Sequence, residues 1–121
     1  MKIASLWQLN DGSLELRPEL ERCRDPELKR QILGFLSGGG YVLRSPGLRE
    51  DRLDLSRTDA VPLGYLSDGE WIWPLEMAYY LEQHDILPEE EFQAHMRAHE
   101  YEAAEPPADV LAAAARLLTD G

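Results

Sequence analysis

Residues 61–74 read Val61-Pro62-Leu63-Gly64-Tyr65-Leu66-Ser67-Asp68-Gly69-Glu70-Trp71-Ile72-Trp73-Pro74 and carry the strongest structural signal in the chain. Two runs that favour extended backbone flank Asp68-Gly69, a pair typical of a two-residue turn between antiparallel strands. We therefore predict a β-hairpin in which Ser67 lies opposite Glu70. Because a two-residue loop fixes the pairing, this register also fixes which side chains share a face.

The two faces of this hairpin differ in character. One face carries Trp71 and Trp73, and we expect the missing side chain of Gly64 to make room for the Trp73 ring. The other face carries Tyr65 and Ile72. Alternation alone does not say which of the two faces is turned to water, and either would present apolar anchors to a partner.

Capping residues and periodicity predict the next clear element. Asp25 has the character of an N-cap residue, and Pro26 follows at the first helical position. The buried stripe of this helix is expected to contain Leu28, Ile32, Phe35 and Leu36. Glycines 38–40 then end the helix, since glycine adopts the left-handed backbone of a helix C-terminus without a Cβ penalty.

Together these signals predict an α+β domain with a small, mostly antiparallel sheet and the hairpin at its centre. We expect strands at 3–9, 41–44, 61–67 and 70–73, and about four helices covering the sheet. Helices that begin near Pro74 and Pro88 should pack as a helical hairpin. The chain is expected to be one domain, 1–121, with a short linker near 103–108 before a C-terminal helix.

Charge separates the two halves of the chain. The net charge is −11 over 121 residues. Residues 1–60 hold ten acids and ten bases, whereas 61–121 hold thirteen acids and two arginines. Such acidity disfavours nucleic acid and anionic membranes as partners and favours a protein with a basic surface. Because there is no export signal or apolar run of about 20 residues, and Cys23 is the single cysteine, we expect a cytoplasmic protein.

No motif for nucleophilic or acid–base catalysis is present, so an enzyme is not predicted. The one metal-like spacing is Glu91, His95 and His99, which follow one another at four-residue intervals along a predicted helix. This set lacks the His-Glu-x-x-His pattern and would need a further ligand, such as His84 or an acid. Partly exposed histidines among acids are the commoner reading, and we predict no metal and no cofactor.

Aromatic side chains beside acids are typical of protein interfaces with apolar anchors and a charged rim. We therefore expect the partner-binding residues to be Tyr65, Asp68, Glu70, Trp71, Trp73, Glu89, Glu90 and Glu91. In this reading the triplet 89–91 steers a basic partner by long-range attraction and the hairpin anchors it.

The hairpin motif Gly-Tyr-x-Ser-Asp-Gly-x-Trp-x-Trp-Pro, with the helix start at Pro88, resembles short uncharacterised proteins of high-GC actinobacteria over residues 60–99. The resemblance implies a bacterial protein of this fold. In size, acidity and lack of catalytic motifs the chain is also similar in type to immunity proteins, which neutralise a bacterial toxin by covering its active cleft. We therefore expect an immunity-type inhibitor. The alternative is a regulatory or scaffolding module, including a homodimer through the hairpin edge.

Overall fold

The computed structural model describes residues 1–120 and contains six strands and four helices within that range. The strands are β1 (Lys2–Ile3), β2 (Trp7–Asn10), β3 (Ser13–Leu16), β4 (Gly40–Arg49), β5 (Val61–Ser67) and β6 (Trp71–Pro74). The helices are α1 (Pro26–Leu36), α2 (Glu76–His84), α3 (Glu90–Ala98) and α4 (Ala108–Asp120). The predicted α+β class, with a small sheet and four helices, is confirmed.

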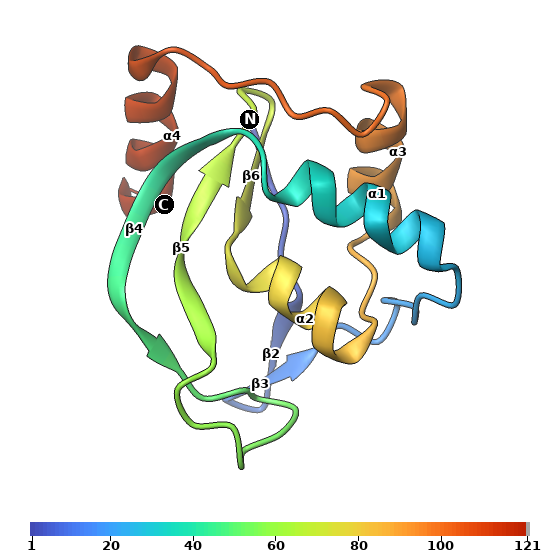
Figure 1. Cartoon of the computed structure of the whole chain (residues 1–121). Coiled ribbons are helices and arrows are strands. Elements are labelled where there is room, and N and C mark those ends of the chain that lie inside the picture. The colour runs from blue at the N-terminus through green and yellow to red at the C-terminus, as the bar shows by residue number, and fades with distance from the viewer. Residues whose placement is uncertain (121) are drawn as a thin grey trace.

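The main sheet has the strand order β1-β6-β5-β4, so the β5–β6 hairpin is central, as predicted (Figure 1). Two of the three strand pairs are antiparallel, and β1 runs parallel to β6. Because β4 pairs with β5 and β1 pairs with β6 at Trp71 and Ile72, both sides of the hairpin are covered. The hairpin is thus interior to the sheet, and the edge strands of this sheet are β1 and β4; a homodimer stays a prediction.

The predicted strand at 3–9 is divided into two. Its first part, β1, joins the main sheet, whereas β2 pairs with β3 in a separate two-stranded sheet. Between the two parts, Ala4 and Leu6 turn inward and are fully buried. The apolar run thus enters the core at its middle and could not remain one continuous strand.

The hairpin register differs from the predicted one. Ser67 lies opposite Ile72 and Leu66 opposite Trp73, so the loop is longer by two residues. The cause is the Asp68 carboxylate, whose Oδ1 accepts hydrogen bonds from the backbone amides of Glu70 and Trp71, each at 2.9 Å. Since the shift along β6 is two residues, every side chain keeps its predicted face.

Both faces of β6 are buried, which alternation could not reveal. Trp71, Ile72 and Trp73 are 5%, 0% and 0% exposed. The tryptophans face the helices: the Trp73 indole donates a hydrogen bond to the Leu36 carbonyl of α1 at 3.1 Å, and Trp71 stacks on Phe92 of α3 at 4.7 Å between ring centroids. The expectation of an exposed aromatic hairpin face is therefore wrong for these two residues, which belong to the core.

Room for the Trp73 ring is provided by Gly39, not by Gly64. A Cβ on Gly39, whose φ is +77°, would lie 3.1 Å from the Trp73 ring and 2.6 Å from the Ser67 carbonyl oxygen. A Cβ on Gly64 would instead meet the Leu43 carbonyl oxygen of the neighbouring strand at 2.6 Å. Each glycine thus permits a close approach of two backbone segments.

The helices are arranged differently from the expected helical hairpin. Helix α1 packs against both α2 and α3, while α4 packs against β4 (Figure 1). The N-cap of α1 is the predicted one, since Asp25 accepts from the amides of Glu27 and Leu28. In the part of the chain that the structure describes, each helix is too short or too polar to cross a lipid bilayer.

Candidate functional site

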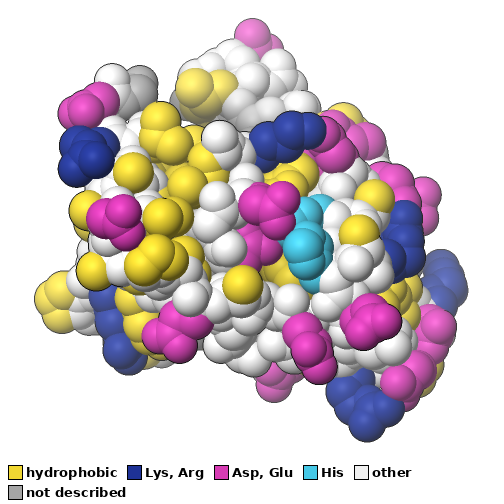
Figure 2. Space-filling model, turned by 90° about the horizontal axis from the view of Figure 1, so that it is seen from above, with side chains coloured by type: hydrophobic (Ala, Val, Ile, Leu, Met, Phe, Trp, Pro, Cys, Tyr) yellow, Lys and Arg dark blue, Asp and Glu magenta, His cyan; other side chains and the backbone are white. Residues whose placement is uncertain are grey.

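Two histidines of α3 and two acids of the hairpin turn come together at the surface. His95 Nε2 lies 2.5 Å from Asp68 Oδ2, and His99 Nε2 lies 3.2 Å from Glu70 Oε2. The two imidazole rings are tilted toward each other with 4.5 Å between their centroids. We call these four residues the His–acid cluster. Figure 2 shows histidine side chains lying directly against acidic side chains on this face.

Local structure explains how the cluster is held. The hairpin turn fixes Asp68. The Asp68 side chain is only 4% exposed, and the His95 side chain is 11% exposed. His99 is the C-cap of α3 and is followed by Glu100 and Tyr101, both with left-handed backbone at φ of +55° and +59°. Two successive non-glycine residues in this conformation are unusual and strained, and they turn the chain sharply just after His99.

The structure assembles a potential metal-binding set that differs from the one considered from sequence. Glu70, His95 and His99 each offer a ligand atom, and these atoms lie within 4.8 Å of one another. Glu91, the acid one turn before His95, instead pairs with Lys2. Four-residue helical spacing pointed to Glu91, but it could not show that a turn 25 residues upstream of His95 brings Glu70 beside both imidazoles.

The acidic triplet of α3 is locally paired. Glu89 contacts Arg17, Glu90 contacts Arg97 at 2.7 Å, and Glu91 contacts Lys2. Glu89 is the least exposed of the three, and its hydrogen bond raises the pKa of Arg17. The predicted steering charge at 89–91 is therefore largely balanced by two cations from the N-terminal part of the chain, Lys2 and Arg17, and by Arg97 of the same helix.

Acids without such partners lie just beyond α3. Within residues 1–120, no salt bridge involves Glu100, Glu102, Glu105 or Asp109, all of which are exposed. Their segment runs past the hairpin turn, because a Cβ on Gly69 would lie 3.6 Å from the Cβ of Pro106. These unpaired acids thus belong to a segment that passes the hairpin turn and not to the α3 N-terminus.

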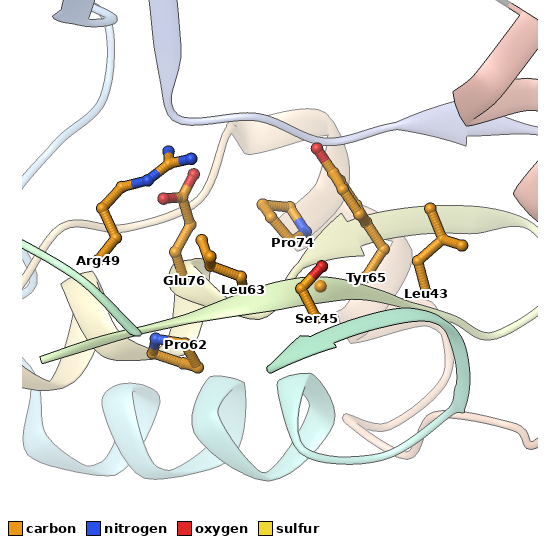
Figure 3. A pocket seen from close by; sticks show the side chains of 9 residues that line it. Leu43, Ser45, Arg49, Pro62, Leu63, Tyr65, Pro74 and Glu76 are labelled. Atoms are coloured by element: carbon orange, nitrogen blue, oxygen red, sulfur yellow. The ribbon is translucent and has the colours of Figure 1, made fainter. Parts of the chain in front are cut away.

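A hollow of about 240 Å³ opens on the sheet face that points away from α1 (Figure 3). Its lining consists of Leu43, Ser45, Arg49, Pro62, Leu63, Gly64, Tyr65, Pro74 and Glu76. Arg49 and Glu76 stand at one end, and Tyr65 and Leu43 stand at the other (Figure 3). Of the predicted partner-binding aromatics, Tyr65 is thus the one that reaches an open surface.

A buried polar network around Asp51 was not predicted from the sequence. Asp51 is fully buried; it accepts a hydrogen bond from the Tyr79 hydroxyl at 2.8 Å and lies 2.6 Å from His84 Nε2. Burial raises the pKa of Asp51, but hydrogen bonds from His84, Tyr79 and the Leu53 amide outweigh it and leave the pKa below its usual range. His84, considered from sequence as an added metal ligand, is therefore committed to this network.

The hydrogen bonds of Asp51 hold the loop after β4 against α2, so we assign this network a structural role. The His–acid cluster and the hollow around Tyr65 are surface features whose geometry suits binding. No protein-family model matches this chain, and no curated protein or solved structure matches it either.

Proposed function

We propose that this chain is a non-catalytic protein-binding domain that docks its partner on the open sheet face around Tyr65. The observation that carries the proposal is the hollow of about 240 Å³ on that face, bordered by apolar side chains. Leu43 at its margin is 39% exposed, and Leu63, Tyr65 and Pro74 also line the hollow. Apolar side chains gathered on one face of an otherwise charged surface are typical of protein interfaces.

Charge supports a basic partner. The unpaired acids at 100–109 add a negative field that attracts a basic surface over a distance of about one Debye length, roughly 8 Å at physiological salt. Such attraction raises the association rate more than the final affinity. An immunity-type inhibitor, which must reach a toxin before the toxin acts, fits this combination of apolar anchor and acidic surroundings.

The first experiment tests the docking face. Tagged protein is used to capture partners from native lysate, with wild type, Leu43→Glu and Leu55→Glu compared side by side. Leu55 is a matched control because it is also an exposed leucine, at 70%, and lies outside the hollow. We expect one stoichiometric protein to be retained by wild type and Leu55→Glu and lost by Leu43→Glu. Equal capture by all three would refute docking on this face.

A second measurement tests the charge. Once the partner is purified, its association rate is measured for wild type and for the double change Glu102→Lys and Glu105→Lys, at low and moderate salt. We expect at least a several-fold slower association for the double variant at low salt, and convergence of the two rates as salt screens the charges. Identical rates at low salt would show that these acids do not steer the partner.

A further inference from the structure

The His–acid cluster has the composition of a transition-metal site. Two imidazoles and one carboxylate are ligand types that zinc accepts in its three-ligand sites. They come from two elements, the hairpin turn and the end of α3, and their ligand atoms lie within 4.8 Å of one another. We propose that Glu70, His95 and His99 bind a Zn²⁺ ion, with a fourth position open to water or to an incoming ligand.

The one separation that can be compared with coordination geometry agrees with a shared ion. Ligand atoms at about 2.0–2.1 Å from a tetrahedral zinc are separated by roughly 3.3–3.4 Å. His99 Nε2 and Glu70 Oε2 lie 3.2 Å apart. The separation of these two atoms is thus close to the separation that two ligand atoms of one tetrahedral zinc ion would have.

Asp68 supplies the support that metal-binding histidines ordinarily have. A ligating imidazole usually donates its other N–H to a carboxylate, which fixes the ring and the tautomer. Asp68 Oδ2 is 2.5 Å from His95 Nε2. In the tautomer that carries its proton on Nε2, the carboxylate accepts that hydrogen bond and Nδ1 has the lone pair that a metal would use. Because Asp68 Oδ1 is itself bound by two backbone amides, the positioning group is rigid.

The three proposed ligands differ in exposure in a way that suits a metal ion bound at the surface. The His95 side chain is 11% exposed, whereas His99 and Glu70 are 45% and 64% exposed. One ligand is thus nearly buried and two are reachable from water. An ion at this position would tie the hairpin turn to the strained end of α3.

The test uses the full chain without a histidine tag. Metal content after equilibration with Zn²⁺ is measured by mass spectrometry, and affinity by competition with a chromogenic chelator. Cobalt is a second probe, because tetrahedral Co²⁺ absorbs visible light strongly. We expect one Zn²⁺ per chain and a tetrahedral Co²⁺ spectrum. Less than stoichiometric zinc at saturation would overturn the proposal.

Matched variants locate the ion. Glu70→Gln and His99→Gln change exposed side chains, so they should leave folding intact, which circular dichroism checks. Each is expected to weaken Zn²⁺ binding at least 10-fold, and Asp68→Asn by about 10–100-fold. Glu91→Gln, on the same helix but outside the cluster, should bind Zn²⁺ as wild type does. Wild-type affinity in Glu70→Gln, or equal weakening in Glu91→Gln, would place the ion elsewhere and refute this site.

Discussion

Asp68 and His95 connect the hairpin turn to α3, with Asp68 Oδ2 lying 2.5 Å from His95 Nε2 across 27 residues of sequence. The same carboxylate accepts two backbone amides of the turn through its other oxygen. One nearly buried side chain therefore sets the local hairpin register and also joins two distant elements.

Replacing Asp68 should expose this double role. We expect Asp68→Ala to lower the free energy of unfolding by about 2–3 kcal/mol, because two amides and one imidazole lose a buried partner. Asp68→Asn, which keeps an acceptor for the turn amides, should cost less. Urea unfolding of both variants measures the difference. Wild-type stability in Asp68→Ala would mean that the turn holds its register without the carboxylate.

Acid should weaken the Asp51 network. The pKa of Asp51 is below its usual value in the folded chain, so its contribution is complete above the unfolded value of about 3.9 and is lost as pH falls through the folded-state pKa. Between pH 6 and pH 3, wild type should therefore lose more stability than Asp51→Asn. Urea unfolding across this range is the measurement, with Asp59→Asn, at an exposed position, as the control expected to behave as wild type. Parallel losses in wild type and Asp51→Asn would contradict the assignment.

Two glycines in neighbouring elements should respond oppositely to alanine. Gly39→Ala should cost about 2 kcal/mol or more, because φ is +77° and the new Cβ would lie 2.6 Å from the Ser67 carbonyl oxygen. Gly34→Ala, within α1 and with no atom within 4 Å of the new Cβ, should be neutral or stabilising by up to about 1 kcal/mol. Thermal unfolding of both variants gives the comparison. A stable Gly39→Ala protein would show that the Gly39 backbone can relax.

Glu89, which the sequence analysis assigned to partner binding, should instead contribute to the stability of the fold. Its carboxylate pairs with Arg17, which also donates to the Ser5 carbonyl oxygen at 2.9 Å. We expect Glu89→Ala to cost about 1–2 kcal/mol, since a partly buried arginine loses its main charged acceptor. Glu102→Ala, at an exposed position, should change stability by less than about 0.5 kcal/mol. Chemical denaturation distinguishes the two, and equal effects would show that the Arg17 pair contributes little.

Local signals in the chain were sufficient for the fold class and for most of the elements, although not for the separate β2–β3 sheet. Asp25-Pro26 marked the start of α1, and Asp68-Gly69 marked the hairpin, because capping and turn preferences depend on neighbouring residues. The assignment of the β6 side chains to two faces was also correct, since a register shift of two residues preserves alternation. The length of the hairpin loop did not, because it depends on where one Asp68 carboxylate places its hydrogen bonds.

Contacts between segments that are distant in the sequence could be known only from the tertiary structure. Alternation separates two faces of β6 but carries no information about what covers each one, so the burial of Trp71 and Trp73 could not be read from it. The pairing of Glu91 with Lys2, and the approach of Glu70 to His99, depend on how the turn and α3 pack against the core. Helical spacing reports neighbours within one helix, whereas a binding site joins side chains from several elements, and their meeting is set by the packing of the whole chain.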